Sequence, residues 1–258
     1  MANDAAIGVF DSGLGGISVV NQIHKELPHE DILFFGDSAH APYGTRSTTD
    51  VQRLSFAVAN HLVERGVKAI VIACNTATSA AASALRQRYN VPIIGMEPAL
   101  KLACDLGDGK PQHVLVTATP LTLREKKFAA LMKRFESIHT IEKLPTPRLV
   151  EIVENGQLHD SALVYETLHE YLDDFDLSSI NSIVLGCTHF TYYREYFKAF
   201  VPSHVAIVDG NDGTARHLHE ILRNRDALSQ RTRLGTIALE NSSPDSRLMA
   251  LSEEFVER

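Results

Sequence analysis

Short apolar runs rich in β-branched residues alternate along the chain with longer amphipathic stretches. The apolar runs have the length of buried strands, and the amphipathic stretches repeat their apolar positions with the helical period. Strands are predicted at 7–10, 32–35, 69–73, 91–95, 114–117, 183–186 and 205–208, and helices at 17–27, 49–65, 76–89, 122–135, 161–175 and 213–223. This alternation predicts an α/β fold with mainly parallel sheets flanked by helices.

Three of the predicted strands recur later in the chain at nearly constant spacing. Residues 69–76 resemble residues 182–189, which lie 113 positions later, residues 7–12 resemble 114–119 at an offset of 107, and residues 91–94 resemble 205–208 at an offset of 114. Because only two copies are present, we expect two pseudo-symmetric α/β domains with a cleft between them rather than a solenoid.

The repeat suggests where the two domains begin and end. We assign residues 1–97 together with 209–258 to the first domain and residues 98–208 to the second. After the last predicted strand, the apolar segment 236–239 and a helix from about Pro244 could return to either sheet.

The composition and charge of the chain limit the kinds of molecule that it is expected to bind. Of the 258 residues, 44% are hydrophobic and 22% are charged, which is typical of a globular protein. A net charge of −7 without a clustered basic segment argues against nucleic acid as a partner. The N-terminus has no basic and apolar leader, and the densest apolar run, 69–74, is too short to cross a membrane. We expect a cytoplasmic protein that binds a small molecule.

The three cysteines, Cys74, Cys104 and Cys187, are too widely spaced for a CxxC-type zinc or redox site, and their odd number argues against a disulfide framework. Cys74 and Cys187 each end an apolar strand and occupy the same place in the repeat. Ligands of parallel sheets gather at the carboxyl ends of the strands. We therefore expect these two thiols to face each other across the cleft, and Cys104 to be a core residue.

Two opposed thiols can invert a stereocentre. A thiolate on one side removes a proton from carbon, and a thiol on the other side supplies a proton to the opposite face. The peptide dipoles at the start of the predicted helix 76–89 are expected to lower the pKa of Cys74 and to favour its thiolate. This chemistry needs no cofactor, but donors must stabilise the charge that develops on the substrate.

Residues 11–16 (DSGLGG) can supply such donors, because they join a strand to a helix and their glycines let backbone N–H groups approach an anion. Ser18 stands where a dinucleotide-binding GxGxxG motif would need glycine. Asp11 could orient or deprotonate Cys74, or only cap the helix. His189 has no second ligand at metal spacing, so no metal site is expected.

Four motifs occur in order: DSGLGG at 11–16, PYGT at 42–45, ACNTA at 73–77 and GCTH at 186–189. Together they are similar to the motifs of the bacterial glutamate racemases, in the aspartate/glutamate racemase superfamily, and the resemblance runs from residue 7 to about residue 216. It implies a cofactor-independent enzyme that interconverts L- and D-glutamate, the D-form being a peptidoglycan precursor. It also implies two pseudo-symmetric α/β domains with the active site between them, and it suggests a homodimer.

The same resemblance implies roles for individual residues. Cys74 and Cys187 match the two catalytic acid/base cysteines, and Asp11, Glu154 and His189 match residues that assist them. The positions that match substrate-binding residues are Asp11, Ser12, Tyr43, Gly44, Asn75, Thr76, Thr188 and His189.

The segment that supplies the assisting carboxylate departs from the pattern of the relatives. Thr146 stands where they usually have Cys, and Glu151 where they usually have Pro. Glu151 and Glu154 both lie in this segment, so either could assist, and the register favours Glu154.

Other functions are compatible with the same residues. A racemase of aspartate or a related amino acid is one, because thiol chemistry does not set the length of the substrate's side chain. A non-catalytic cytosolic amino-acid binding protein is another. A thiol redox protein would need the two Cα atoms within about 4.4–6.8 Å, which a substrate-sized gap does not allow.

Overall fold

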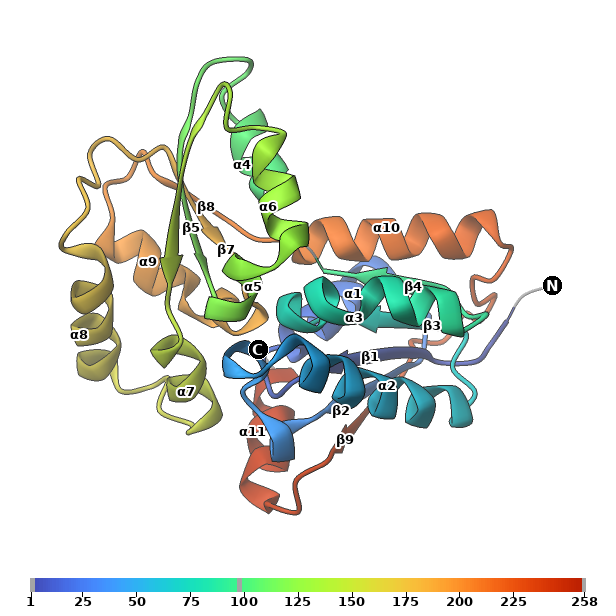
Figure 1. The fold of residues 1–258 in the computed structure, drawn as a ribbon. Helices are drawn as coiled ribbons and strands as arrows, with labels where there is room; N and C mark the ends of the chain where they lie inside the picture. The colour runs from blue at the N-terminus through green and yellow to red at the C-terminus, as the bar shows by residue number, and fades with distance from the viewer. Residues whose placement is uncertain (1–2, 97–98, 257–258) are drawn as a thin grey trace.

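The computed structural model describes residues 3–96 and 99–256 and folds them into two parallel β-sheets, each flanked by helices (Figure 1). The first sheet has the strand order β4-β3-β1-β2-β9, and all of its pairings are parallel. Its strands are β1 (Ile7–Asp11), β2 (Ile32–Gly36), β3 (Ala69–Ile72), β4 (Ile93–Gly95) and β9 (Ile237–Asn241).

Helices cover both faces of the first sheet because successive strand residues point to opposite sides and are apolar on both. Ile7 and Val9 pack into one hydrophobic cluster with α1, α10 and α11, while Phe10 packs into another with α2 and α3. The helical segments of this half are α1 (Ile17–Glu26), η1 (Ser38–His40), η2 (Tyr43–Thr45), α2 (Thr48–Glu64), α3 (Asn75–Arg88), α10 (Asn211–Asn224) and α11 (Ser246–Val256).

The second sheet is smaller and has the strand order β6-β5-β7-β8, again with parallel pairings throughout. Its strands are β5 (His113–Ala118), β6 (Thr140–Pro145), β7 (Ser182–Leu185) and β8 (Ala206–Val208). The helical segments around it are α4 (Leu100–Asp105), α5 (Pro120–Arg124), α6 (Lys126–Lys133), α7 (Arg148–Glu154), α8 (Ser161–Leu172), η3 (Thr188–Tyr193) and α9 (Arg194–Phe200).

The two sheets share one topology, which confirms the predicted α/β class with two mainly parallel sheets. Strands β8, β7, β5 and β6 of the second sheet follow the same order as β4, β3, β1 and β2 of the first. The three offsets found in the sequence therefore relate strands that occupy equivalent places. β9 extends the first sheet through its pairing with β2. The predicted boundary between the two domains, at residues 97–98, lies outside the described residues.

The predicted elements differ from the observed ones in three respects: one helix is divided in two, the strand β6 was not predicted, and neither were the helices α7 and α9. The helix predicted over 122–135 is two helices, α5 and α6, because Glu125 between them is extended, with φ −66° and ψ 141°. Thr119 caps α5 and Pro120 begins it, so the first helix also starts earlier than predicted. Strand β6 was not predicted, because as an edge strand it carries mostly half-exposed and exposed side chains instead of a continuous apolar run.

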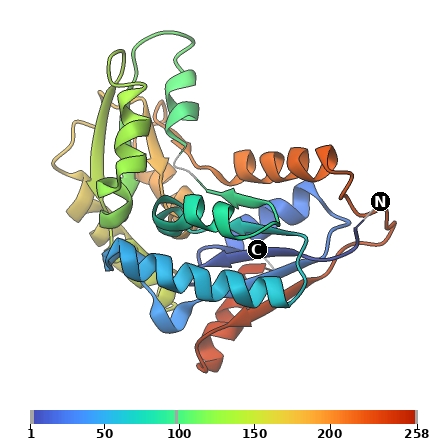
Figure 2. The ribbon, with the colours of Figure 1, turned by 45° about the vertical axis from the view of Figure 1, so that its right-hand side comes forward.

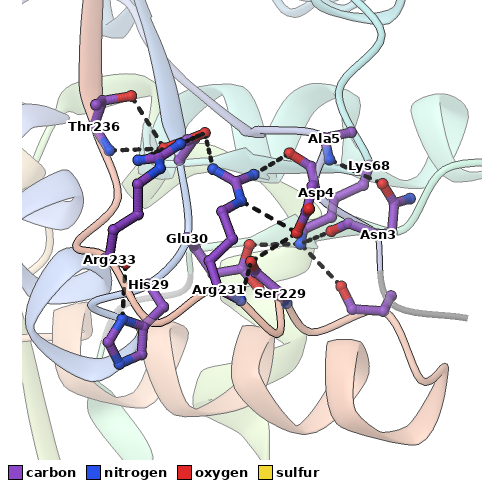
Figure 3. A network of polar contacts seen from close by, with 12 residues as sticks. Asn3, Asp4, Ala5, His29, Glu30, Lys68, Ser229, Arg231, Arg233 and Thr236 are labelled. Carbon is purple, nitrogen blue, oxygen red and sulfur yellow. Dashed lines mark hydrogen bonds and ion pairs between the residues drawn. The ribbon is translucent and has the colours of Figure 1, made fainter.

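The last part of the chain returns to the first half. Figure 2 shows α10 lying along α1, and the two helices pack on the same hydrophobic cluster. The segment after α10 is then held by a polar network at the amino end of the first sheet (Figure 3). Lys68 lies 2.5 Å from Glu30 in this network and donates to the carbonyl of Ala227, and Arg231 pairs with Asp31. These contacts fix the segment that leads into β9.

None of the helices in the described parts of the chain combines the length and apolar character that a membrane span requires.

Candidate active site

The two predicted cysteines directly follow equivalent strands of the two sheets. Cys74 follows β3 and is the N-cap of α3, and Cys187 follows β7 and precedes η3. Both side chains are almost buried, with 6% and 7% of their surface exposed. Both are free thiols, as is Cys104. Cys104 lies in a hydrophobic cluster around α4 and β5, as expected for a core residue.

Cys74 begins a hydrogen-bond chain that ends at a buried carboxylate. Its Sγ lies 3.8 Å from Ser12 Oγ, which donates to Asp11 Oδ1 at 3.2 Å. Burial, followed by the negative charge of Asp11, raises the pKa of Cys74 to about 12, although the N–H of Ala77 donates to its sulfur at 3.4 Å. The expected lowering of this pKa by the helix start is therefore wrong. One amide donor does not offset the loss of water and the nearby carboxylate.

Cys187 begins a second chain, which also ends at a carboxylate. Its Sγ lies 3.7 Å from His189 Nδ1, and His189 Nε2 lies 2.6 Å from Glu154 Oε1. Burial by itself would lower the pKa of His189, but its hydrogen bonds to Cys187 and Glu154 outweigh burial and raise that pKa well above the usual value. The imidazolium is therefore favoured at neutral pH between a sulfur and a carboxylate.

Asp11 connects the two halves of the protein. Its fully buried carboxylate accepts hydrogen bonds from Gly13 N at 3.0 Å and from Thr188 Oγ1 at 2.8 Å. Burial raises the pKa of Asp11, while the charge of His189 and the Thr188 hydrogen bond act in the opposite direction. Thr188 belongs to the second half, so this carboxylate is shared between the ends of both sheets.

The glycines of the 11–16 loop allow the second half to approach closely. A Cβ atom on Gly13 would lie 2.0 Å from Glu154 Oε1, and one on Gly15 would lie 2.4 Å from His189 Nδ1. The N–H of Leu14 donates to the same Glu154 oxygen at 2.6 Å. The N–H groups of Gly13 and Leu14 thus already bind carboxylates of the protein, and this loop joins the two halves.

The segment that contains Tyr43 and Gly44 lies at the same junction. Tyr43 is buried and donates its hydroxyl hydrogen to Asp37 Oδ2 at 2.5 Å, and burial together with Asp37 raises the pKa of Tyr43. Gly44 packs against Thr119 of the second half. Asp37 was not singled out in the sequence, where it reads as part of a turn after a strand.

A cluster of three buried threonines forms another contact between the halves. Thr76 Oγ1 lies 2.8 Å from Thr119 Oγ1 and 3.1 Å from Thr122 Oγ1. Asn75, beside Thr76, is also buried at the start of α3. Sequence reasoning missed Thr119 and Thr122, yet the repeat held a signal, because residues 7–12 align with 114–119 and thereby pair Ser12 with Thr119.

The structure separates the two candidate carboxylates of α7. Glu154 accepts hydrogen bonds from His189 and from the glycine loop, whereas Glu151 is exposed on the surface of the same helix. Thr146 is buried after β6, and its hydroxyl finds no hydrogen-bond partner among the described residues.

Comparison with known proteins places the chain among amino-acid racemases. The model of the family described as Asp/Glu/Hydantoin racemase matches residues 7–218. A glutamate racemase from Bifidobacterium animalis subsp. lactis is 59% identical over the full length of both chains.

Solved structures agree with this sequence relationship. The glutamate racemase isoform RacE1 from Bacillus anthracis has a TM-score of 0.87 at 28% identity, covering 98% of this chain and 94% of that chain. The enzyme from Francisella tularensis, solved in complex with D-glutamate, has a TM-score of 0.84 at 28% identity, covering 99% and 94%. The chain therefore belongs to the Asp/Glu/Hydantoin racemase family, and within it to the bacterial glutamate racemases.

Proposed function

We propose that this protein interconverts L- and D-glutamate by proton transfer between two cysteines, Cys74 and Cys187, without a cofactor. The observation that carries the proposal is the matched pair of thiols at equivalent strand ends, each connected through one side chain to a carboxylate. The relative from Francisella tularensis was solved with D-glutamate, which supports glutamate as the substrate.

The two chains suit the two proton transfers. One thiolate removes the proton from Cα, and the thiol on the opposite face supplies a proton to the planar carbon that results. On the Cys74 side, the thiol proton passes to Ser12 Oγ while the Ser12 proton passes to Asp11 Oδ1. Burial raises the pKa of Asp11, which makes this carboxylate a better proton acceptor than an ordinary aspartate.

On the Cys187 side, a cation supports the thiolate. The imidazolium of His189 lies beside the sulfur and stabilises its negative charge, and Glu154 holds the imidazole in place from the other nitrogen. The reverse reaction uses the same groups with the roles of the two cysteines exchanged. Two different supports for two thiols thus allow either enantiomer to be the substrate.

The remaining positions are proposed to bind the charged groups of glutamate. Asn75 and Thr76 lie at the start of α3, where the first backbone N–H groups have no acceptor within the helix. Thr188 and His189 occupy the equivalent place after β7, and Tyr43 and Gly44 close the site where the halves meet. Local donors of this kind can bind the two carboxylates of glutamate despite the net charge of −7.

The test is racemisation of L-glutamate in deuterated water. D-glutamate carrying deuterium at Cα is expected, because the donating thiol exchanges with solvent between turnovers. Cys74→Ala and Cys187→Ala should each nearly abolish the reaction, whereas Cys104→Ala, which removes a core thiol, should keep it. D-glutamate without deuterium, no D-glutamate, or full activity in either of the first two variants would contradict the proposal. A panel with aspartate and other amino acids tests the substrate.

We further propose that the D-glutamate supplies peptidoglycan synthesis in the cytoplasm and that the enzyme is a homodimer. These points rest on what the resemblance of the four motifs to the bacterial glutamate racemases implies. Depletion of the protein should produce a D-glutamate requirement for growth, and sedimentation analysis should give twice the mass of one chain.

A further inference from the structure

A cavity of about 260 Å³ opens beside the candidate active site. Its walls come from three segments that are far apart in the sequence: the stretch after β2 that includes Ser38 and Pro42, the helix α7, and the start of α11. Figure 1 shows these segments converging at the junction of the two halves. The volume lies below the roughly 300–1,000 Å³ of pockets for drug-sized ligands, so it suits a molecule of amino-acid size.

Glu154 links this cavity to the site. Its carboxylate lines the cavity and also holds His189, the partner of Cys187. The two cysteines are nearly buried, while 15% of the Glu154 side chain is exposed. Both hydrogen bonds to Glu154 use Oε1, and within the described residues no protein group donates to Oε2. Glu154 thus joins the buried site to a solvent-accessible cavity.

The opposite wall leads to the site as well. The stretch that contains Ser38 and Pro42 continues directly into Tyr43 and Gly44, which lie at the junction of the halves. A small molecule in the cavity therefore lies between two segments that both end in candidate site residues. A cavity in this position can serve as an entrance through which a small molecule reaches the candidate active site.

The cavity carries one positive side chain, Arg247, at the start of α11. Arg247 donates to the carbonyl oxygen of Asn155 at 3.0 Å and lies 3.5 Å from Asp245, and 53% of its side chain is exposed. The other charged groups that line the cavity are Glu151 and Glu154. In a chain with a net charge of −7, an incoming anion is repelled except where a cation is presented.

We propose that this cavity is the substrate entrance and that Arg247 captures a carboxylate of the incoming amino acid. The negative charge of Glu151 repels the same carboxylate. The inference rests on the proposed function, because it takes glutamate, which carries one net negative charge at neutral pH, as the substrate. Arg247 touches no reacting atom in this scheme and acts on the approach of the substrate.

The test compares two charge removals at the same cavity. Arg247→Gln removes the positive charge but keeps a side-chain donor for Asn155. At low ionic strength it should lower kcat/KM for glutamate about threefold or more, chiefly through KM, with kcat nearly unchanged. Glu151→Gln should raise kcat/KM by a similar or smaller factor. Both effects should disappear near 1 M salt, where the Debye length is only about 3 Å.

Arg216→Gln is the matched control. Arg216 is an exposed arginine of α10 that pairs with Asp212 and does not line the cavity, so its loss should change kcat/KM much less. An unchanged kcat/KM in Arg247→Gln, a decrease that persists in high salt, or a decrease in Glu151→Gln would overturn the entrance while leaving the racemase intact. A wild-type protein that does not racemise glutamate would instead overturn the proposed function, and this inference with it.

Discussion

Thr188 donates a hydrogen bond of 2.8 Å to Asp11 across the boundary between the two sheets. Thr188 follows β7 in the second half, and Asp11 is the last residue of β1 in the first. Asp11 also accepts from Ser12, which the Cys74 thiol contacts. The residue that contacts one thiol through Ser12 is therefore positioned by the loop that carries the other, so the two proposed proton-transfer sites form one unit.

Asp11→Asn separates two effects of this carboxylate on Cys74: its charge raises the pKa of the thiol, and it is the proposed acceptor of the thiol proton. The negative charge of Asp11 is, after burial, the main cause that raises the pKa of Cys74 to about 12. Its removal should lower that pKa and increase the thiolate fraction at a given pH, so Cys74 should react about 3–10 times faster with iodoacetamide at pH 9. Racemisation should instead fall, because the proton acceptor is lost.

Peptide mapping by mass spectrometry measures the alkylation of each cysteine separately. Cys104, a core thiol remote from Asp11, is the internal control and should react at the same rate in both proteins. Slower alkylation of Cys74 in Asp11→Asn would show that the carboxylate does not hold the thiol in its protonated form.

Glu154→Gln should lower the pKa of His189, because the variant removes the negative charge that stabilises the imidazolium. If the reaction needs the imidazolium, activity falls as the pH rises through the His189 pKa, and in the variant this loss should occur at lower pH. We also expect a roughly tenfold lower kcat at neutral pH. The profile of kcat/KM against pH and the NMR titration of His189 measure the shift.

The stability of the fold should depend on pH in the same direction as the activity. The folded-state pKa of His189 lies above its ordinary value of about 6.5, so its charge stabilises the fold fully below that value. The contribution is lost as the pH rises through the folded-state pKa, and in Glu154→Gln it should be lost earlier. Glu151→Gln, three residues away on the exposed surface, should leave the midpoint of both profiles in place.

Gly15→Ala should disrupt the contact between the halves. The new Cβ would lie 2.4 Å from His189 Nδ1 and 2.6 Å from Thr188 Oγ1, so the loop or the second half must move. A displacement of about 1 Å at a catalytic group can cost about 100-fold in rate, and we expect a loss of kcat of this size.

Gly213→Ala provides the comparison. Gly213 lies within α10, and a Cβ there would meet no atom within 4 Å. This variant should keep full activity and gain up to about 1 kcal/mol in the free energy of unfolding, because alanine favours a helix over glycine. Equal activity of the Gly15 and Gly213 variants would contradict the close-packing role of the loop.

The parts of the fold and site that repeat were accessible from the sequence. The strands that precede Cys74 and Cys187 are almost entirely apolar, because both faces of each sheet are covered, and the offset between them revealed the pairing. The strand β6 was missed because an edge strand needs no such run. It begins 108 residues after β2, counting from residue 32 to residue 140, and so completes the repeat.

Properties that depend on contacts between segments far apart in the sequence were not accessible in this way. The high pKa of Cys74 arises from burial and from Asp11, neither of which the local sequence around the cysteine reveals. The glycine loop was expected to offer free N–H groups to an anion. In the structure, the N–H of Gly13 donates to Asp11 of the same loop, and the N–H of Leu14 donates to Glu154 of the second half.

Lys68→Met should destabilise the fold without removing the active site. Lys68 and Glu30 form an ion pair in which only 1% and 2% of the side chains are exposed, and Lys68 also donates to the carbonyl groups of Asn3 and Ala227 (Figure 3). Removal of one partner leaves an unpaired buried charge, so the free energy of unfolding should fall by about 3–5 kcal/mol, as measured by urea denaturation.

Two further variants distinguish this buried pair from an ordinary surface contact. Lys198→Met breaks an exposed pair with Glu195 and should cost at most about 1 kcal/mol. Addition of Glu30→Gln to Lys68→Met removes the unpaired charge and should recover part of the loss. Lys68 precedes β3 while Cys74 follows it, so the folded Lys68 variant should still racemise glutamate at 25 °C. Loss of turnover in a fully folded variant would mean that this network, at the opposite end of the strand, acts on the site.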